Sequence, residues 1–247
     1  MIPLLAFFVA SGSVADAPRR IAFTFDDGPS WRTTPALLES LDRWGVRATF
    51  FVNGYRFAGE SDVARKNREV LRMVRDRGHS IGNHTFQHLP LRRLDPKAQR
   101  AEIVRNEEAI LATLGDRPTL FRPPYGRQSQ SSWRIVHERG YRVVLWDVSP
   151  LDHSLHNATR LRDKVMEDIR RKEGGIVILH DTYAWTVQAF GLIMEDLYRE
   201  NCRLLAQGDT PYQVVTLQQL LDPTADPAGR ERWIASLRPV CNRMGTW

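Results

Sequence analysis

Short apolar runs alternate with longer amphipathic segments along almost the whole chain of 247 residues, and no other feature limits the fold as strongly. The run Ile176–Leu179 shows no polar alternation, which is typical of a strand covered on both faces. Regular strand–helix alternation favours a parallel sheet covered by helices. We expect strands at Arg20–Phe25, Ala48–Val52, Ser80–Asn83, Thr119–Phe121, Tyr141–Val148, Ile176–Leu179 and Gln213–Thr216. We expect helices at Thr34–Trp44, Val63–Arg77, Pro96–Leu114, Ser131–Arg139, Ala158–Lys172, Val187–Arg199 and Leu217–Leu221.

The number of strand–helix units predicts the fold class. About seven units fit the length of the chain, so we predict an α/β protein, an irregular (β/α) barrel of about seven units. Neither an internal repeat nor an interdomain linker interrupts the pattern, and a core of this size needs no disulfide or metal for folding alone. We expect three parts: residues 1–17 as a signal peptide, residues 18–221 as one domain, and residues 222–247 as a C-terminal tail.

The first residues resemble a secretory signal. The apolar run Ile2–Ala10 is too short to span a bilayer as a mature helix, so no stable membrane span is expected. Ala15-Asp16-Ala17 has the small-x-small pattern of a cleavage site, which predicts cleavage after Ala17 and a secreted or periplasmic protein. No Lys or Arg precedes the apolar run, and the alternatives are a ragged N-terminal helix or a wrongly chosen start codon.

The formal net charge of +6 admits an anionic partner such as nucleic acid, anionic lipid or cell wall. The densest basic run, between Arg65 and Arg77, falls on an amphipathic helical pattern and is interpreted as a solvated helix face. No RNA-binding or helix-turn-helix signature accompanies it, so we expect no nucleic-acid partner, and we expect a monomer. Cys202 and Cys241 form no CxxC pattern, which argues against a cysteine-built zinc site; in an oxidising compartment they could pair.

Polar residues follow several of the expected strands, and in parallel α/β folds such strand ends carry the functional residues. His84 and His88 have the spacing that places two imidazoles on one side of a helical turn. Two imidazoles and a carboxylate make a three-ligand zinc site with an open position. Position 85 is not Glu, so this is not the metalloprotease motif. Taken alone, this spacing fits two surface histidines as well as it fits two metal ligands.

Asp26 and Asp27 directly follow the first expected strand. Because neighbouring side chains diverge, one carboxylate can bind a metal while the other acts as a base towards a water molecule. An isolated Asp-Asp-Gly-Pro sequence is more often a turn or a helix cap. Arg122 can hold a carboxylate in a fixed orientation. The prolines before Tyr125 restrict the backbone and can hold the Tyr125 N–H outward as a donor.

With these residues in view, the chain resembles the polysaccharide deacetylase (NodB-homology) family, carbohydrate esterase family four. The resemblance extends from about Ile21 to Leu221, implies a barrel of the NodB-homology type, and makes residues 18–221 the catalytic domain. Three complete motifs in the family order are far more specific than any one of them. The five motifs fall on Thr24–Pro29, His84–His88, Arg122–Tyr125, Ser149–His153 and Ile178–His180.

The last two motifs depart from the family pattern. Ser149 replaces the first Asp of the fourth motif, and His153 replaces the Trp that helps to wall the acetyl pocket. Ile178 replaces a Leu of the fifth motif, which is a mild apolar change. The resemblance therefore implies intact catalytic groups and leaves the substrate preference open.

The resemblance implies a metal-dependent hydrolase that removes N-acetyl groups from N-acetylglucosamine-containing polysaccharide, such as peptidoglycan or chitin-like oligomers, and releases acetate. One divalent metal, with Zn²⁺ expected and Co²⁺ or Ni²⁺ as alternatives, polarises the acetamide carbonyl and lowers the pKa of water. The Tyr125 N–H and the metal stabilise the oxyanion. The other implied roles are metal ligands for Asp27, His84 and His88, general base for Asp26 positioned by Arg122, and general acid for His180 with Asp152 as its partner.

Two other functions remain open at this point, namely an O-acetyl (xylan-type) esterase with the same site and a glycan-binding protein without turnover. Tyr125, Ile178 and His153 are expected to contact the substrate around the acetyl group. Trp31 and Trp185 lie on loops near the motifs and are expected to contact sugar rings; the alternative is that they pack their loops onto the barrel.

Overall fold

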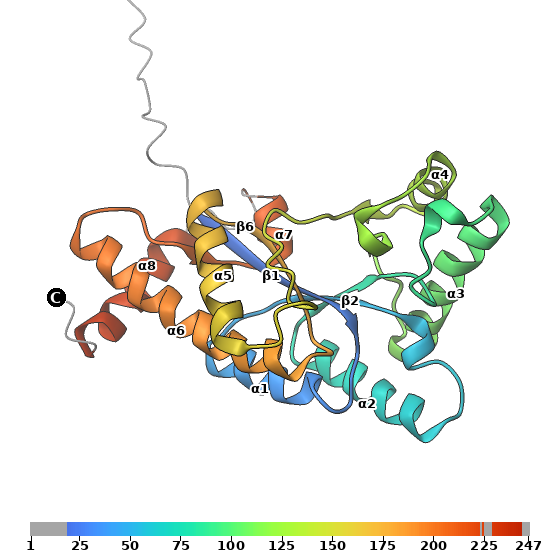
Figure 1. Ribbon diagram of the computed structural model, residues 1–247, viewed down its shortest axis with the longest axis horizontal. Helices are drawn as coiled ribbons and strands as arrows, with labels where there is room; N and C mark the ends of the chain where they lie inside the picture. Colours follow the sequence, from blue (N-terminus) through green and yellow to red (C-terminus); the bar gives the residue numbers. More distant parts are fainter. Residues whose placement is uncertain (1–18, 223, 225–228, 244–247) are drawn as a thin grey trace, which may run out of the picture.

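The structure is a computed structural model, and it describes residues 19–222, 224 and 229–243 (Figure 1). The expected signal peptide, residues 1–17, lies outside the described residues. Within the described part, no helix combines the length and apolar character that crossing a membrane requires.

Seven parallel strands form one curled sheet, which confirms the predicted α/β class and irregular (β/α) barrel. The order in the sheet is β5-β4-β3-β2-β1-β6, and β7 pairs with the start of β1. The strands are β1 (Arg20–Gly28), β2 (Thr49–Val52), β3 (Ser80–Asn83), β4 (Leu120–Phe121), β5 (Arg142–Val143), β6 (Gly175–His180) and β7 (Gln213–Val214).

Helices surround the strands, with α8 at one end of the molecule and α3 and α4 at the other (Figure 1). Local sequence explains their ends. At α3, for example, Asp95 accepts a hydrogen bond from the Ala98 N–H at 2.8 Å, and Gly115 adopts a left-handed conformation after the last turn. The helices are α1 (Thr34–Arg43), α2 (Asp62–Asp76), α3 (Pro96–Leu114), α4 (Gln130–Glu138), α5 (Ala158–Lys172), α6 (Ala184–Ala206), α7 (Leu217–Leu221) and α8 (Gly229–Arg243). Three short 3₁₀ helices are η2 (Gly54–Arg56), η3 (Leu91–Arg93) and η4 (Pro124–Gly126).

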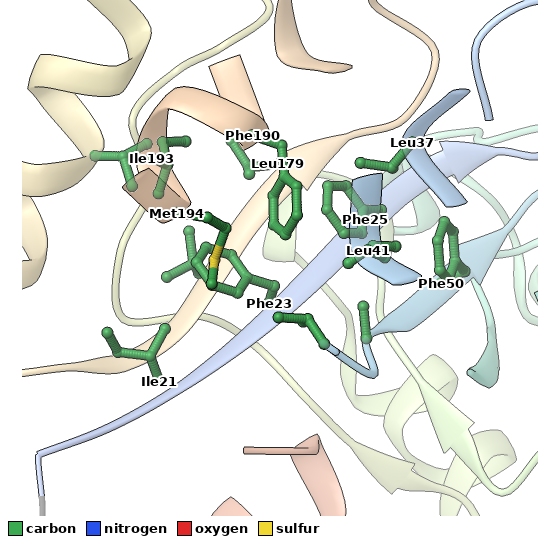
Figure 2. Close-up of a cluster of buried hydrophobic side chains, with 14 of the residues drawn as sticks. Ile21, Phe23, Phe25, Leu37, Leu41, Phe50, Leu179, Phe190, Ile193 and Met194 are labelled. Atoms are coloured by element: carbon green, nitrogen blue, oxygen red, sulfur yellow. The ribbon is translucent and has the colours of Figure 1, made fainter. Parts of the chain in front are cut away.

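The main core lies between the central strands and helices α1 and α6 (Figure 2). Phe25 of β1 stacks on Phe50 of β2 at a centroid distance of 5.2 Å, and Phe23 meets the edge of Phe190 of α6 at the same distance. Side chains alternate across a strand, so Thr24 and its neighbours of the same parity face the interior of the barrel. Burial of each large apolar side chain contributes about 1.5–3 kcal/mol, so this layer anchors β1 firmly.

The predicted strand Tyr141–Val148 is wrong in its length, because only Arg142–Val143 forms strand β5 beside β4. Beyond β5 the chain crosses to the opposite edge of the sheet, where Val148 makes an isolated parallel bridge with Val177 of β6. An apolar segment that must span two edges cannot pair along its length with either of them. The crossing joins the two edges of the sheet and gives the barrel its irregular closure.

The predicted C-terminal tail contains helix α8, which packs on α6. A disulfide joins Cys202 of α6 to Cys241 of α8, and both cysteines are buried with Leu237. Trp233 of α8 donates a hydrogen bond from its indole N–H to the Tyr212 carbonyl at 2.9 Å. The two cysteines therefore hold a helix to the barrel.

Candidate active site

The carboxyl ends of β1, β3, β4 and β6 meet at one end of the barrel and surround a cavity of about 340 Å³. The parallel sheet explains why residues from distant motifs meet there. The lining residues predicted from the sequence as functional are Asp26, Asp27, His84, His88, Tyr125, Asp152, His153, Ile178 and His180. The cavity is completed by Trp146, Ser149, Leu151 and Tyr183.

Asp27, His84 and His88 form a group whose ligand atoms all lie within 4.8 Å of one another. The Asp27 Oδ1 atom lies 3.6 Å from His84 Nε2 and 3.4 Å from His88 Nε2. This oxygen is buried, and within the described part of the chain it has no hydrogen-bond partner. A buried carboxylate oxygen without a donor, facing two imidazole nitrogens, fits a divalent cation, and the donor set is one that Zn²⁺ accepts.

The ring of His84 is held in the orientation that a metal ligand needs. Its Nδ1 lies 2.7 Å from the carbonyl oxygen of Arg122, so the Nδ1–H donates there and the lone pair of Nε2 faces Asp27. Burial lowers the pKa of His84 to about 3, against the opposing effect of the Asp27 charge. The ring is therefore neutral at physiological pH and available for coordination.

Strained backbone conformations are concentrated at this end of the barrel. Asp27, Thr85, His88, Tyr125 and Leu151 have φ angles between 57° and 70°. Among the described residues other than glycine, one further residue has a positive φ, in the α5–β6 turn. Such conformations cost of order 1–3 kcal/mol each and persist where the surroundings enforce them, which is common at functional sites.

Buried polar side chains enforce the backbone of the histidine loop. The Asn53 side-chain amide donates to the carbonyl oxygens of His84 and Thr85, at 2.7 and 3.2 Å. Asn83 Oδ1 accepts from the Thr85 N–H at 2.9 Å, and Glu102 Oε2 accepts from the Gln87 N–H at 2.8 Å. The sequence analysis missed Asn53, Asn83 and Glu102, because support for a loop backbone leaves no spacing pattern in the sequence.

Arg122 is fully buried and binds Asp26 inside the barrel. Its Nη1 donates to Asp26 Oδ1 at 2.7 Å and to Thr24 Oγ1 at 2.8 Å. Its Nε and Nη2 donate to the carbonyl oxygens of Val144 and Leu145, at 3.1 and 2.9 Å, just beyond the end of β5. The guanidinium thus has a fixed position, and it fixes the carboxylate of Asp26 in turn.

The second oxygen of Asp26 remains directed towards the metal-binding group. Asp26 Oδ2 lies 3.6 Å from His84 Nε2. Burial raises the pKa of Asp26, and the positive charge of Arg122 opposes this effect. A carboxylate with one oxygen anchored and the other free is suited to accept a proton in the cavity.

His180, at the end of β6, is paired with a buried Asp152. Asp152 Oδ1 lies 2.7 Å from His180 Nδ1, and Asp152 Oδ2 accepts from the His180 backbone N–H at 2.7 Å and from Thr186 Oγ1 at 2.9 Å. Burial by itself lowers the pKa of His180, but the hydrogen bond and charge of Asp152 outweigh it and raise the pKa to about 9. His180 Nε2 lies 3.8 Å from Asp27 Oδ2, so a protonated ring reaches the metal-binding group.

The two tryptophans predicted to contact sugar lie outside this cavity. Trp185 donates from its indole N–H to the Asp152 carbonyl at 2.8 Å and stacks on Tyr183 at 4.7 Å. Trp31 lines a neighbouring hollow that shares Asp27 and Tyr183 with the cavity. Trp185 is therefore placed to position Asp152, whereas Trp31 lies under the cationic groups of Arg32 and Lys66 and its contact with sugar stays a prediction.

Tyr125 stands at the rim with its side chain 59% exposed and its ring 4.8 Å from that of His88. None of the hydrogen bonds between described residues uses its backbone N–H. Tyr125 has a positive φ of 59° within the proline-held turn, and the outward direction of its N–H as a donor stays a prediction.

Comparison with known proteins bears on the same residues. The family model for polysaccharide deacetylase matches residues 13–144, which include the metal-binding group, Asp26, Arg122 and Tyr125. The chain belongs to the polysaccharide deacetylase family. The matched segment ends before Asp152 and His180, so the assignment of these two residues to the site depends on the geometry of the cavity.

The polysaccharide deacetylase relatives include enzymes named for bacterial and chitin-derived glycans. The chain is 31% identical to the peptidoglycan N-acetylglucosamine deacetylase PgdA of Listeria monocytogenes over 83% of this chain and 40% of that protein. It is 35% identical to a chitooligosaccharide deacetylase of a Bradyrhizobium species, over 74% of this chain and 79% of that protein. The chain thus spans well under half the length of PgdA, with which it shares one region.

Among solved structures, the peptidoglycan deacetylase PdaC of Bacillus subtilis is similar, with a TM-score of 0.67 and 31% identity. The similarity covers 86% of this chain and 96% of that one. The barrel of this chain therefore matches nearly the whole of the solved PdaC chain.

The geometry of the site predicts different roles for the two adjacent aspartates, with Asp27 binding the metal and Asp26 acting as the base. We expect His88→Ala to weaken Zn²⁺ binding by about 100-fold or more. Loss of a residue that only supports a metal ligand already lowers metal affinity by about 10–100-fold, and loss of the ligand itself should lower it further. We expect Asp26→Asn to retain the metal and to lower kcat by about 10²–10⁴-fold, because a base is lost. Metal content by plasma mass spectrometry and Zn²⁺ titration against a competing chelator measure these effects.

The control for this experiment is His137→Ala, since His137 is exposed on α4 and should leave metal binding unchanged. Thermal melting identifies any variant that fails to fold. If Asp26→Asn empties the site and Asp27→Asn does not, the two aspartates have been assigned the wrong way round.

The His180–Asp152 pair predicts a pH dependence. A proton donor must be protonated, so kcat should fall as the pH rises through the pKa of His180, which lies at about 9 without a metal and lower beside a bound cation. Asp152→Asn removes the main group that raises this pKa, so the alkaline limb of the kcat profile should move to lower pH. An alkaline limb unchanged in Asp152→Asn, in a folded protein, would contradict the pairing.

Proposed function

We propose that this chain is a metal-dependent deacetylase that removes N-acetyl groups from N-acetylglucosamine-containing polysaccharide, such as peptidoglycan or chitin-like oligomers, and releases acetate. The observation that carries the proposal is the placement of an anchored carboxylate, Asp26, and a protonated imidazole, His180, against one metal-binding group. The activities named for the relatives support the choice of an acetylated amino sugar.

The first step needs a base and a positioned carbonyl. When bound by Asp27, His84 and His88, the metal polarises the acetamide carbonyl and makes water more acidic. Asp26 accepts a proton from the attacking water through its free oxygen, while Arg122 keeps the other oxygen fixed. The oxygen of water forms a bond to the carbonyl carbon.

The tetrahedral stage places negative charge on the former carbonyl oxygen. The Tyr125 N–H is free to donate to this oxygen, and removal of one such donor in comparable enzymes costs about 3–4 kcal/mol. The strained backbone at Tyr125 fixes the direction of the N–H before the substrate arrives. The charge is therefore met by a group that needs no rearrangement.

The second step breaks the bond between carbon and nitrogen. An amine leaves poorly as an anion, so the nitrogen must gain a proton as the bond breaks. His180 supplies this proton from Nε2, and Asp152 stabilises the positive ring that precedes the transfer. The carbon–oxygen double bond re-forms, and the products are acetic acid, which ionises to acetate, and a free amino sugar. Asp26 then releases the proton that it took from water, and His180 regains a proton from solvent.

The rim of the cavity supports contact with a sugar chain. Tyr125 and Leu151 expose 59% and 54% of their surface there and so offer apolar surface to a sugar ring. His153 and Ile178 line the cavity beside them, where the acetyl methyl group would lie. The hollow at Trp31 extends the surface beyond one sugar ring.

We propose further that the enzyme acts outside the cytoplasm. The buried disulfide between Cys202 and Cys241 is of the kind that persists in oxidising compartments. Peptidoglycan, which is named for relatives of this chain, lies in such compartments. Both observations support a secreted or periplasmic enzyme, with Zn²⁺ as the metal that its three donors favour.

The test is incubation of the zinc-loaded protein with N-acetylglucosamine oligomers, peptidoglycan and acetylxylan, followed by mass spectrometry of the glycans and measurement of acetate. We expect loss of acetyl groups from the amino sugars, and none in His180→Gln. Acetate from acetylxylan alone would identify an O-acetyl esterase. Binding of glycan and metal without any hydrolysis would identify a non-catalytic protein.

A further inference from the structure

A second hollow, of about 580 Å³, lies next to the active-site cavity and shares Tyr125 with it. One side is formed by η3 and the proline before it, and the other by η4 and the residue that follows it. We call this hollow the arginine groove. It is lined by Pro90, Leu91, Arg92, Arg93, Pro124, Tyr125 and Arg127.

Three exposed guanidinium groups, those of Arg92, Arg93 and Arg127, dominate the charge of the groove. No carboxylate is among its lining residues. In the part of the chain that the structure describes, none of the three makes an ion pair, whereas many other arginines of the protein do. Three unpaired cations in one hollow favour an anion from outside the chain.

The backbone that carries these arginines is rigid. The Gln99 side chain donates to the carbonyls of Leu91 and Leu94, both at 2.9 Å, and so fixes η3 against α3. Pro123 and Pro124 restrict the backbone before η4. The long side chains are mobile at their ends, but their attachment points stand in fixed positions beside the active site.

The chemistry of the lining identifies the ligand. Pro90, Pro124 and the ring of Tyr125 offer apolar surface of the kind that covers a sugar face. Guanidinium groups match the planar, two-oxygen geometry of a carboxylate. A neutral chitin chain would leave the three charges without a partner.

We propose that the arginine groove binds a carboxylate-bearing sugar unit next to the amino sugar that is deacetylated, which makes an anionic glycan of the peptidoglycan type the preferred substrate. This inference rests on the proposed function, because it places the groove beside the reacting unit. In peptidoglycan the carboxylate comes either from the lactyl ether of the neighbouring sugar or from its peptide. The shared chemistry is a carboxylate on the glycan strand.

The experiment compares three substrates: peptide-free peptidoglycan strands, peptide-bearing strands and neutral chitin oligomers of equal length. The variants replace Arg92, Arg93 and Arg127 together by Gln or together by Lys. The matched control is Arg43→Gln, because Arg43 is exposed and ends α1, about 15 Å along that helix from the end near the active site.

We expect the triple Gln protein to show a KM about 10-fold or more higher on the anionic strands, since each exposed pair contributes modestly, with kcat nearly unchanged. KM on chitin oligomers should stay the same. The triple Lys protein should recover only part of the loss, because lysine restores the charge but not the planar two-donor geometry, and added salt should weaken the wild-type preference. Loss on only one of the two anionic substrates would show which carboxylate is bound.

Equal KM increases on neutral and anionic substrates, or no change on either, would overturn the inference. If the wild-type protein hydrolyses none of the substrates, the proposed function fails, and the groove is then tested by binding alone. In that case, titration calorimetry with peptide-free strands should still show weaker binding to the triple Gln protein than to Arg43→Gln. Equal binding to both proteins would reject the groove as well.

Discussion

The buried guanidinium of Arg122 meets three separate demands of this structure at one place. Its side chain binds Asp26 and so orients the predicted base. It also donates to the carbonyls of Val144 and Leu145, just beyond β5, where the chain begins to cross between the edges of the sheet. Its backbone carbonyl accepts from His84 and so orients a predicted metal ligand. The closure of the barrel and the geometry of the active site therefore depend on the same residue.

The arrangement is not explained by stability alone. Replacing a buried ion pair by well-packed apolar groups is often neutral or stabilising, whereas removing one partner costs about 3–5 kcal/mol because a charge remains buried. Here the charge is compensated by Asp26, by two carbonyls and by the face of the Phe51 ring, 4.1 Å from the guanidinium carbon. The pair gives the Asp26 carboxylate one defined orientation, which is what its proposed role as a base requires.

The βα periodicity predicted the fold well because strands and helices bury apolar faces with distinct periods, and parallel strands bring their carboxyl ends together. The strand ends indicated that the two aspartates and the two histidines meet at one edge, and the family resemblance implied that Asp27, His84 and His88 form one group, as the structure has them. Periodicity failed for Tyr141–Val148, where an apolar segment spans two edges of the sheet.

Sequence could not indicate supports such as Asn53, whose partners are backbone carbonyls brought near only by the fold. Trp185 illustrates a different limit. Its position after the last motif suggested a sugar contact, yet its indole N–H is directed to the Asp152 carbonyl. Trp185 was expected on a loop, but it lies in the first turn of α6, and the contact that it makes depends on how the fold places this helix against the segment that carries Asp152.

The most direct test of this account is the kcat of Arg122→Lys, measured on protein with full metal content. A lysine ammonium can pair with Asp26, but it cannot also donate to the two carbonyls that a planar guanidinium reaches. The carboxylate should therefore lose its fixed orientation, and kcat should fall by about 100-fold, which matches the usual contribution of a positioned base. The metal should remain, because the Arg122 carbonyl that orients His84 is unchanged. A metal-loaded Arg122→Lys protein with the wild-type kcat would contradict the account.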